Sequence, residues 1–78
     1  MNDGQKQFFQ FIMDRTEPGN EEAMKELLEN VFQQQEKGTF AQMEMMAMVP
    51  KMVAFLREDA REEVMEIVKE YGSKHVNK

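Results

Sequence analysis

The sequence predicts an all-α protein, a small bundle of about four helices. Apolar residues recur every three or four positions, as on one face of a helix, and do not alternate with polar residues as in a strand. Pro50 lacks the N–H that a helix interior needs, so we expect a kink or a short break there. The expected helices cover residues 4–14, 20–36, 40–56 (kinked or broken at Pro50) and 59–71.

The first two expected helices each have one apolar side. The first places Phe8 and Ile12 one turn apart, and the second has the clearest apolar stripe of the chain, through Leu28 and Val31. Gly38 follows this stripe and can take the left-handed conformation that ends helices. Both helices are therefore expected to pack with one face inward.

The third and fourth helices have recognisable ends. Thr39, followed three residues later by Gln42, has the form of a capping box, which predicts the start of the third helix. The fourth helix keeps an apolar stripe through Val64 and Ile67, and Gly72 is expected to end it.

The length of the chain predicts one domain. We assign residues 1–72 to it and expect a flexible C-terminal tail over residues 73–78. A domain of this size buries only about 60% of the surface that its unfolded chain exposes. The sequence has no cysteine, which excludes disulfides and thiolate zinc sites. Stability must then come from helix packing or from a second copy of the chain.

The charge of the chain limits its partners. A net charge of -5 repels phosphate backbones and anionic lipid surfaces, so neither nucleic acid nor membrane is expected to bind. The first residues lack the continuous apolar core of a signal peptide, and the longest apolar run is interrupted by Glu44 and Lys51. We therefore expect a cytoplasmic protein.

The methionine-rich stretch over residues 40–56 is apolar on nearly all sides. A helix of this kind is either the central helix of a bundle or half of an interface. Glu44 and Lys51 are taken to mark its solvent side. Three short neighbours leave part of it uncovered, although burial of all its methionines in one monomer remains the alternative.

A helical wheel divides this stretch into two groups. Met48, Met52 and Phe55 lie nearer the two charges, so we expect them to contact a second chain. The remaining apolar residues, with those of the other helices, are expected to form the core. The predicted core consists of Phe8, Ile12, Leu27, Leu28, Val31, Met46, Val49, Val53, Leu56, Val64 and Ile67.

The sequence offers no set of catalytic, metal-binding or cofactor-binding residues. Ser73 and His75 lie in the expected tail, and the chain has no glycine-rich loop for phosphate. A helical di-iron site needs Glu-x-x-His pairs, and the chain has a single histidine. An acidic stripe is therefore interpreted as a solvated helix face; it consists of Asp59, Glu62, Glu66 and Glu70.

These observations favour a non-enzymatic protein-protein interaction or regulatory module. We expect it to form a homodimer, to bind another protein, or both. Methionine is unbranched and polarizable, and it adapts to irregular partner surfaces. The alternative is a carrier of a ligand or of Cu(I), because thioether sulfur is a soft ligand that selects this ion.

Overall fold

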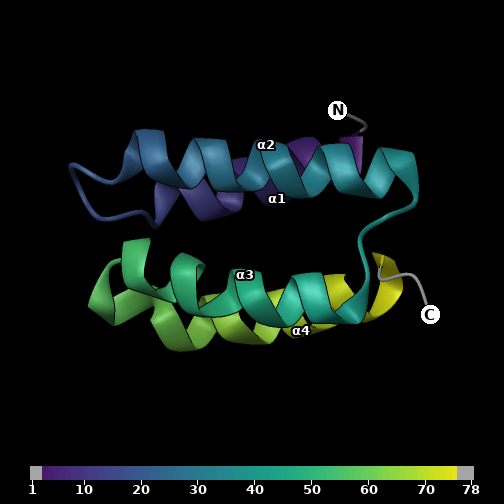
Figure 1. Cartoon of the computed structure of the whole chain (residues 1–78). Coiled ribbons are helices and arrows are strands. Elements are labelled where there is room, and N and C mark those ends of the chain that lie inside the picture. The colour runs from purple at the N-terminus through teal and green to yellow at the C-terminus, as the bar shows by residue number, and fades with distance from the viewer. Residues whose placement is uncertain (1–2, 76–78) are drawn as a thin grey trace.

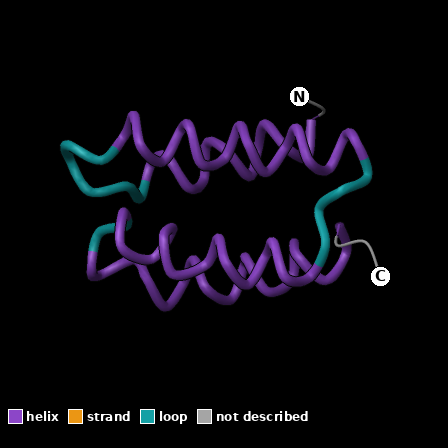
Figure 2. The backbone as a smooth tube through the Cα atoms, viewed as in Figure 1, coloured by secondary structure: helices purple, strands orange, loops and turns teal. Residues whose placement is uncertain are grey.

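Two helical hairpins, stacked as two layers, make up the fold (Figure 1). The computed structural model describes the backbone of residues 3–75 and the side chains of residues 3–70. Its described residues contain helices and loops and no β-strand (Figure 2), which confirms the predicted all-α bundle. The elements are α1 (Asp3–Asp14), α2 (Glu21–Lys37), α3 (Gln42–Phe55), a short 3-10 turn η1 (Glu58–Ala60) and α4 (Arg61–His75).

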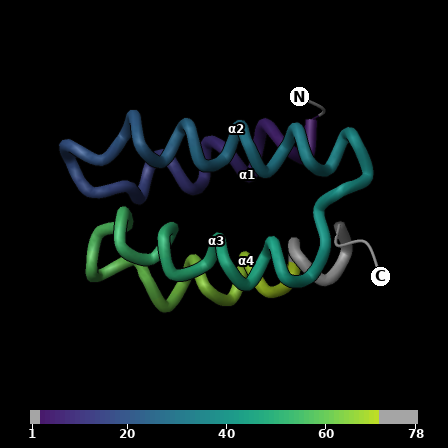
Figure 3. Tube along the Cα trace, viewed as in Figure 1, coloured from purple at the N-terminus to yellow at the C-terminus, as the bar shows by residue number. Residues whose placement is uncertain are grey.

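The helices run alternately up and down the bundle. α1 and α2 form one layer, α3 and α4 form the other, and the α2–α3 loop crosses between the layers at one end (Figure 1). α1 therefore begins at the end of the bundle toward which α4 runs, as the colours of Figure 3 show. This arrangement gives α3 two neighbours, α2 in the opposite layer and α4 in its own.

The α2–α3 connection differs from the sequence prediction in one respect. Gly38 takes the expected left-handed conformation, with φ 73° and ψ 20°, and its N–H donates to the carbonyls of Gln34 and Gln35. The Thr39 hydroxyl also donates to the Gln34 carbonyl, at 3.3 Å. Thr39 thus caps the C-terminal end of α2. The predicted capping box at the start of the third helix is therefore wrong. α3 instead follows an extended Ala41 that makes no side-chain cap.

α3 continues through Pro50, so of the two predicted outcomes, a kink or a break, the break does not occur and the kink stays a prediction. Pro50 has no N–H to donate to the Met46 carbonyl one turn earlier. Because Pro50 is exposed, that carbonyl lies on the solvent side of the helix, where water can satisfy it. The fold thus accepts proline inside a helix by placing it on the outer face.

α4 is longer than predicted. It passes Gly72, where the sequence predicted its end, and reaches His75, so residues 73–75 are helical. Residues 76–78 of the expected tail lie outside the described residues. A glycine inside a helix costs up to about 1 kcal/mol relative to alanine, which is too little to force an end by itself.

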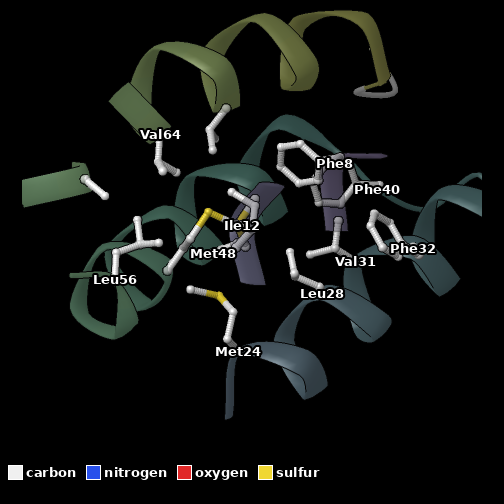
Figure 4. Packing of buried hydrophobic residues seen from close by; sticks show 13 residues of the cluster. Phe8, Ile12, Met24, Leu28, Val31, Phe32, Phe40, Met48, Leu56 and Val64 are labelled. Carbon is white, nitrogen blue, oxygen red and sulfur yellow. The ribbon is translucent and has the colours of Figure 1, made fainter. Parts of the chain in front are cut away.

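The core is continuous between the layers and takes residues from all four helices (Figure 4). Ile12, Met24, Leu28 and Val64 are fully buried. Most of the predicted core residues are buried or lie at the edge of the core. The buried ones are Phe8, Ile12, Leu28, Val31, Leu56 and Val64, and the half-buried ones are Leu27, Val49 and Val53.

Two predicted core residues are on the surface. Met46 is 63% exposed and Ile67 is 37% exposed, so both predictions are wrong. On α4, Val64 and Val68 face the core and leave Ile67 at the side of the helix. Met46 is exposed because α3 is rotated differently from the prediction, as described below.

A short backbone bridge joins the two layers at the end opposite the α2–α3 loop. The Glu17 N–H donates to the Phe55 carbonyl at 2.9 Å, and the Arg57 N–H donates to the Arg15 carbonyl at 3.0 Å. Thr16 lies between them, is buried, and donates its hydroxyl to the Ile12 carbonyl at 2.9 Å. The bridge thereby fixes the C-terminal end of α3 against the α1–α2 loop.

Leu28→Ala tests the core assignment. Removing a fully buried leucine side chain is expected to lower the free energy of unfolding by about 2 to 5 kcal/mol. Met43→Ala is the matched control, since Met43 is 80% exposed and should change stability by less than about 0.5 kcal/mol. Urea unfolding followed by circular dichroism measures both, and equal effects would contradict the assignment.

Pro50→Ala tests how α3 accommodates proline. Alanine supplies the missing N–H and a better helix propensity, so the free energy of unfolding should rise by about 1 to 3 kcal/mol. The same urea titration, at low micromolar protein, measures the change. A destabilised variant would mean that Pro50 makes a contact that the exposed position does not account for.

Candidate interaction surface on α3

An exposed apolar stripe runs along α3 on the side away from the core. Its positions are three or four residues apart, so they share one face of the helix. Met48 and Met52 occupy the opposite face and are buried. We call this exposed face the α3 stripe; it consists of Met43, Met46, Ala47, Pro50 and Ala54.

The two methionines of the α3 stripe are the most exposed large apolar residues that the structure describes. Met43 is 80% exposed and Met46 is 63% exposed. Both lie in the N-terminal half of α3, whereas the C-terminal half of the stripe has the smaller Pro50 and Ala54. Contiguous apolar surface of this kind marks interaction sites more often than isolated exposed residues do.

The predicted interface residues lie elsewhere. Met48 and Met52 are 7% and 1% exposed and belong to the core of their own chain, as Figure 4 shows for Met48. Phe55 is half-buried and packs against the same core. The prediction that Met48 and Met52 contact a second chain is therefore wrong for this rotation of α3, and the same prediction for Phe55 stays a prediction.

The error comes from the interpretation of Glu44 and Lys51. The sequence prediction places these charges at the centre of the solvent side, but both line the groove between α3 and α2. They therefore mark one flank of the exposed face and not its middle. The row formed by Met48, Met52 and Leu56, one turn apart each, was the signal that could have identified the buried face.

The groove between α2 and α3 is small. Its volume is about 90 Å³, and the apolar residues that line it include Leu27, Val31 and Phe40. Small-molecule pockets usually measure about 300 to 1,000 Å³, so this groove does not suit a drug-sized ligand or a cofactor. It lies beside Ala47 and so adjoins the α3 stripe.

The acidic residues do not form a site. The residues of the predicted acidic stripe, Asp59, Glu62, Glu66 and Glu70, are all exposed. Within the described part of the chain, no three aspartate, glutamate or histidine residues gather closely enough to hold a metal ion. No described helix combines the length and the apolar character that crossing a bilayer requires.

The described residues form a small four-helix bundle with an exposed apolar face on α3. Comparisons of the chain with protein-family models, with curated proteins and with solved structures found no match. Functional inference therefore rests on the α3 stripe itself.

Methionine oxidation tests the exposure of the α3 stripe. Dilute hydrogen peroxide should oxidise Met43 and Met46 well before Met48 and Met52, since accessibility governs the reaction of thioethers in a folded protein. Peptide mass spectrometry at several time points measures the order. Faster oxidation of Met48 or Met52 in the folded protein would restore the rotation of α3 predicted from the sequence.

Proposed function

We propose that this protein is a non-enzymatic protein-protein interaction module whose contact surface is the α3 stripe. The observation that carries the proposal is the exposure of Met43 and Met46 on a helix whose opposite face is fully used by the core. A stable contact would remove both side chains from water, at about 25 cal/mol per Å² of apolar surface.

The composition of the α3 stripe suits a helical partner. Methionine adapts its shape to irregular surfaces, and Ala47 and Ala54 allow another backbone to come close. A partner helix with its own apolar face could lie along α3, as in other helix-in-groove contacts. The groove between α2 and α3 would receive side chains at the edge of that contact.

A catalytic function has less support. The hydroxyls of Thr16 and Thr39 both donate to helix carbonyls, which occupies them in ending α1 and α2. Ser73 and His75 lie among the residues whose side chains are not described. The proposal keeps the cytoplasm as the expected compartment.

The Cu(I) carrier remains the second candidate because Met43 and Met46 are exposed one turn apart. Met24, Met48 and Met52 are buried in the core and could ligate only if the bundle opened. If the protein is a carrier, its melting temperature should rise with added Cu(I), because a ligand that binds the folded state stabilises that state. The interaction module should show no such rise.

The double variant Met43→Glu with Met46→Glu tests the proposed surface. Both positions are exposed, so the variant should fold, but a contact would have to bury two charges. The matched control adds the same two charges at exposed sites on other helices, through Gln7→Glu with Gln33→Glu. Far-ultraviolet circular dichroism confirms folding in each case.

Two assays are run on these variants. Sedimentation velocity measures self-association, and a pull-down from the source cell identifies the most enriched partner, whose binding is then repeated with purified protein. The stripe variant should lose self-association or partner binding by at least about tenfold, while the control keeps it. Unchanged behaviour of the stripe variant in both assays would contradict the proposal.

A further inference from the structure

The α3 stripe is self-complementary when a second copy is reversed end to end. Its large side chains, Met43 and Met46, occupy the N-terminal half of α3, and its smaller residues, Pro50 and Ala54, occupy the C-terminal half. An antiparallel pair of such helices sets each large half against the small half of the other. Ala47 lies near the middle, where two backbones would come closest.

We propose that the α3 stripe binds a second copy of this chain, with the two α3 helices antiparallel about a two-fold axis that passes between Ala47 and Met48. This inference rests on the proposed function, because it uses the same surface. In this register Met43 lies between the partner's Pro50 and the partner's Ala54. The large side chain then fills the space that the smaller residues leave.

Charge complementarity supports the same register. Glu44 and Lys51 are exposed on one flank of α3, and among the described residues neither forms an ion pair. They are about 10 Å apart along the axis, at about 1.5 Å per residue, which is too far to pair with each other. Both are equally distant from the proposed two-fold axis. Glu44 therefore meets the partner's Lys51, and Lys51 meets the partner's Glu44.

The orientation follows from these charges. Residues on the same flank face each other in an antiparallel helix pair, so opposite charges meet twice in the dimer. A parallel pair would set opposite flanks together, so Glu44 and Lys51 would face the partner's apolar flank and neither charge would meet an opposite charge. Pairing of opposite charges therefore favours the antiparallel arrangement over the parallel one.

The same register also pairs apolar residues on the other flank of α3. Met46 and Val49 are also equally distant from the same axis, so Met46 meets the partner's Val49. Val49 is half-buried at the edge of its own core, and the exposed Met46 of the second copy would complete its burial. One register therefore pairs opposite charges on one flank and apolar residues on the other, and it places Ala47 near the centre of the contact.

The size of the contact predicts a weak dimer. α3 has 14 residues and is about 21 Å long at about 1.5 Å per residue. One such helix per chain contributes less than the about 800 Å² per partner of a standard interface. We therefore expect dissociation in the micromolar range, and the measurements need protein up to about 500 μM.

Charge reversal gives the test. Glu44→Lys and Lys51→Glu each turn two attractive contacts into two repulsive ones, so each variant should dimerise about three- to tenfold more weakly than the wild type. An equimolar mixture should form heterodimers at least as tightly as the wild type, because every pair is again opposite in charge. Sedimentation equilibrium at about 50 mM salt, where screening is reduced, measures these affinities.

Matched controls separate position from net charge. Glu22→Lys and Lys25→Glu make the same changes of charge at exposed sites on α2 and should leave the dimer within about twofold of the wild type, alone or mixed. If the wild type dimerises and the Glu44 and Lys51 variants dimerise as tightly as these controls, the proposed register is wrong. If the wild type stays monomeric at about 500 μM, the α3 stripe does not bind a second copy of the chain.

Cysteine cross-linking gives a measurement independent of charge. The chain has no cysteine, so Met43→Cys and Ala54→Cys each introduce a single thiol at an exposed site. Oxidation of the mixture should yield mainly the disulfide between the two variants, and little between two copies of Met43→Cys. Equal yields would overturn the antiparallel register. If these tests fail while Met43→Glu with Met46→Glu still abolishes binding of another protein, the proposed function stands without the dimer.

Discussion

The rotation of α3 about its own axis determines both the core and the surface of this protein. Met48, Met52 and Leu56 lie one turn apart and occupy the core between the two layers. α3 is apolar on nearly all sides, so every possible rotation would expose apolar residues. The observed rotation exposes Met43 and Met46 to water, and the proposed function follows from this exposure.

Two local features hold α3 in this rotation. The backbone bridge beside Thr16 fixes the end of α3, because the carbonyl of Phe55 and the residues after it pair with the α1–α2 loop. Pro50 faces outward, where the Met46 carbonyl that lacks a donor can reach water. Turning Pro50 inward would bury that carbonyl without a partner, at a cost of about 1 to 3 kcal/mol.

Arg15 adds a link between the layers near the same end. Its guanidinium lies 3.9 Å from the centre of the Phe11 ring and pairs with Glu63 on α4. The pair is partly exposed, so its contribution to stability is small, about 0 to 1 kcal/mol. The pair therefore connects α1 to α4 across the two layers without adding much stability.

The sequence predicted the parts of the fold in which polar and apolar residues are cleanly separated. α1 and α2 have charged or amide side chains around a single apolar stripe, so Phe8, Ile12 and Leu28 were assigned correctly. α3 offers only Glu44 and Lys51 as markers, and a flank was mistaken for the centre of the solvent side. The row of Met48, Met52 and Leu56 is a weak marker of the buried face, because the opposite face is apolar as well and the neighbouring helices decide which one is buried.

The exposure of the nine methionines tests the account most directly. Methyl NMR of protein labelled at the methionine methyl groups, with a soluble paramagnetic agent, reports how far water reaches each side chain. At low protein concentration Met43 and Met46 should broaden strongly while Met24, Met48 and Met52 stay sharp, and rising concentration should protect the first two. Broadening of Met48 and Met52 ahead of Met43 and Met46 would contradict the account.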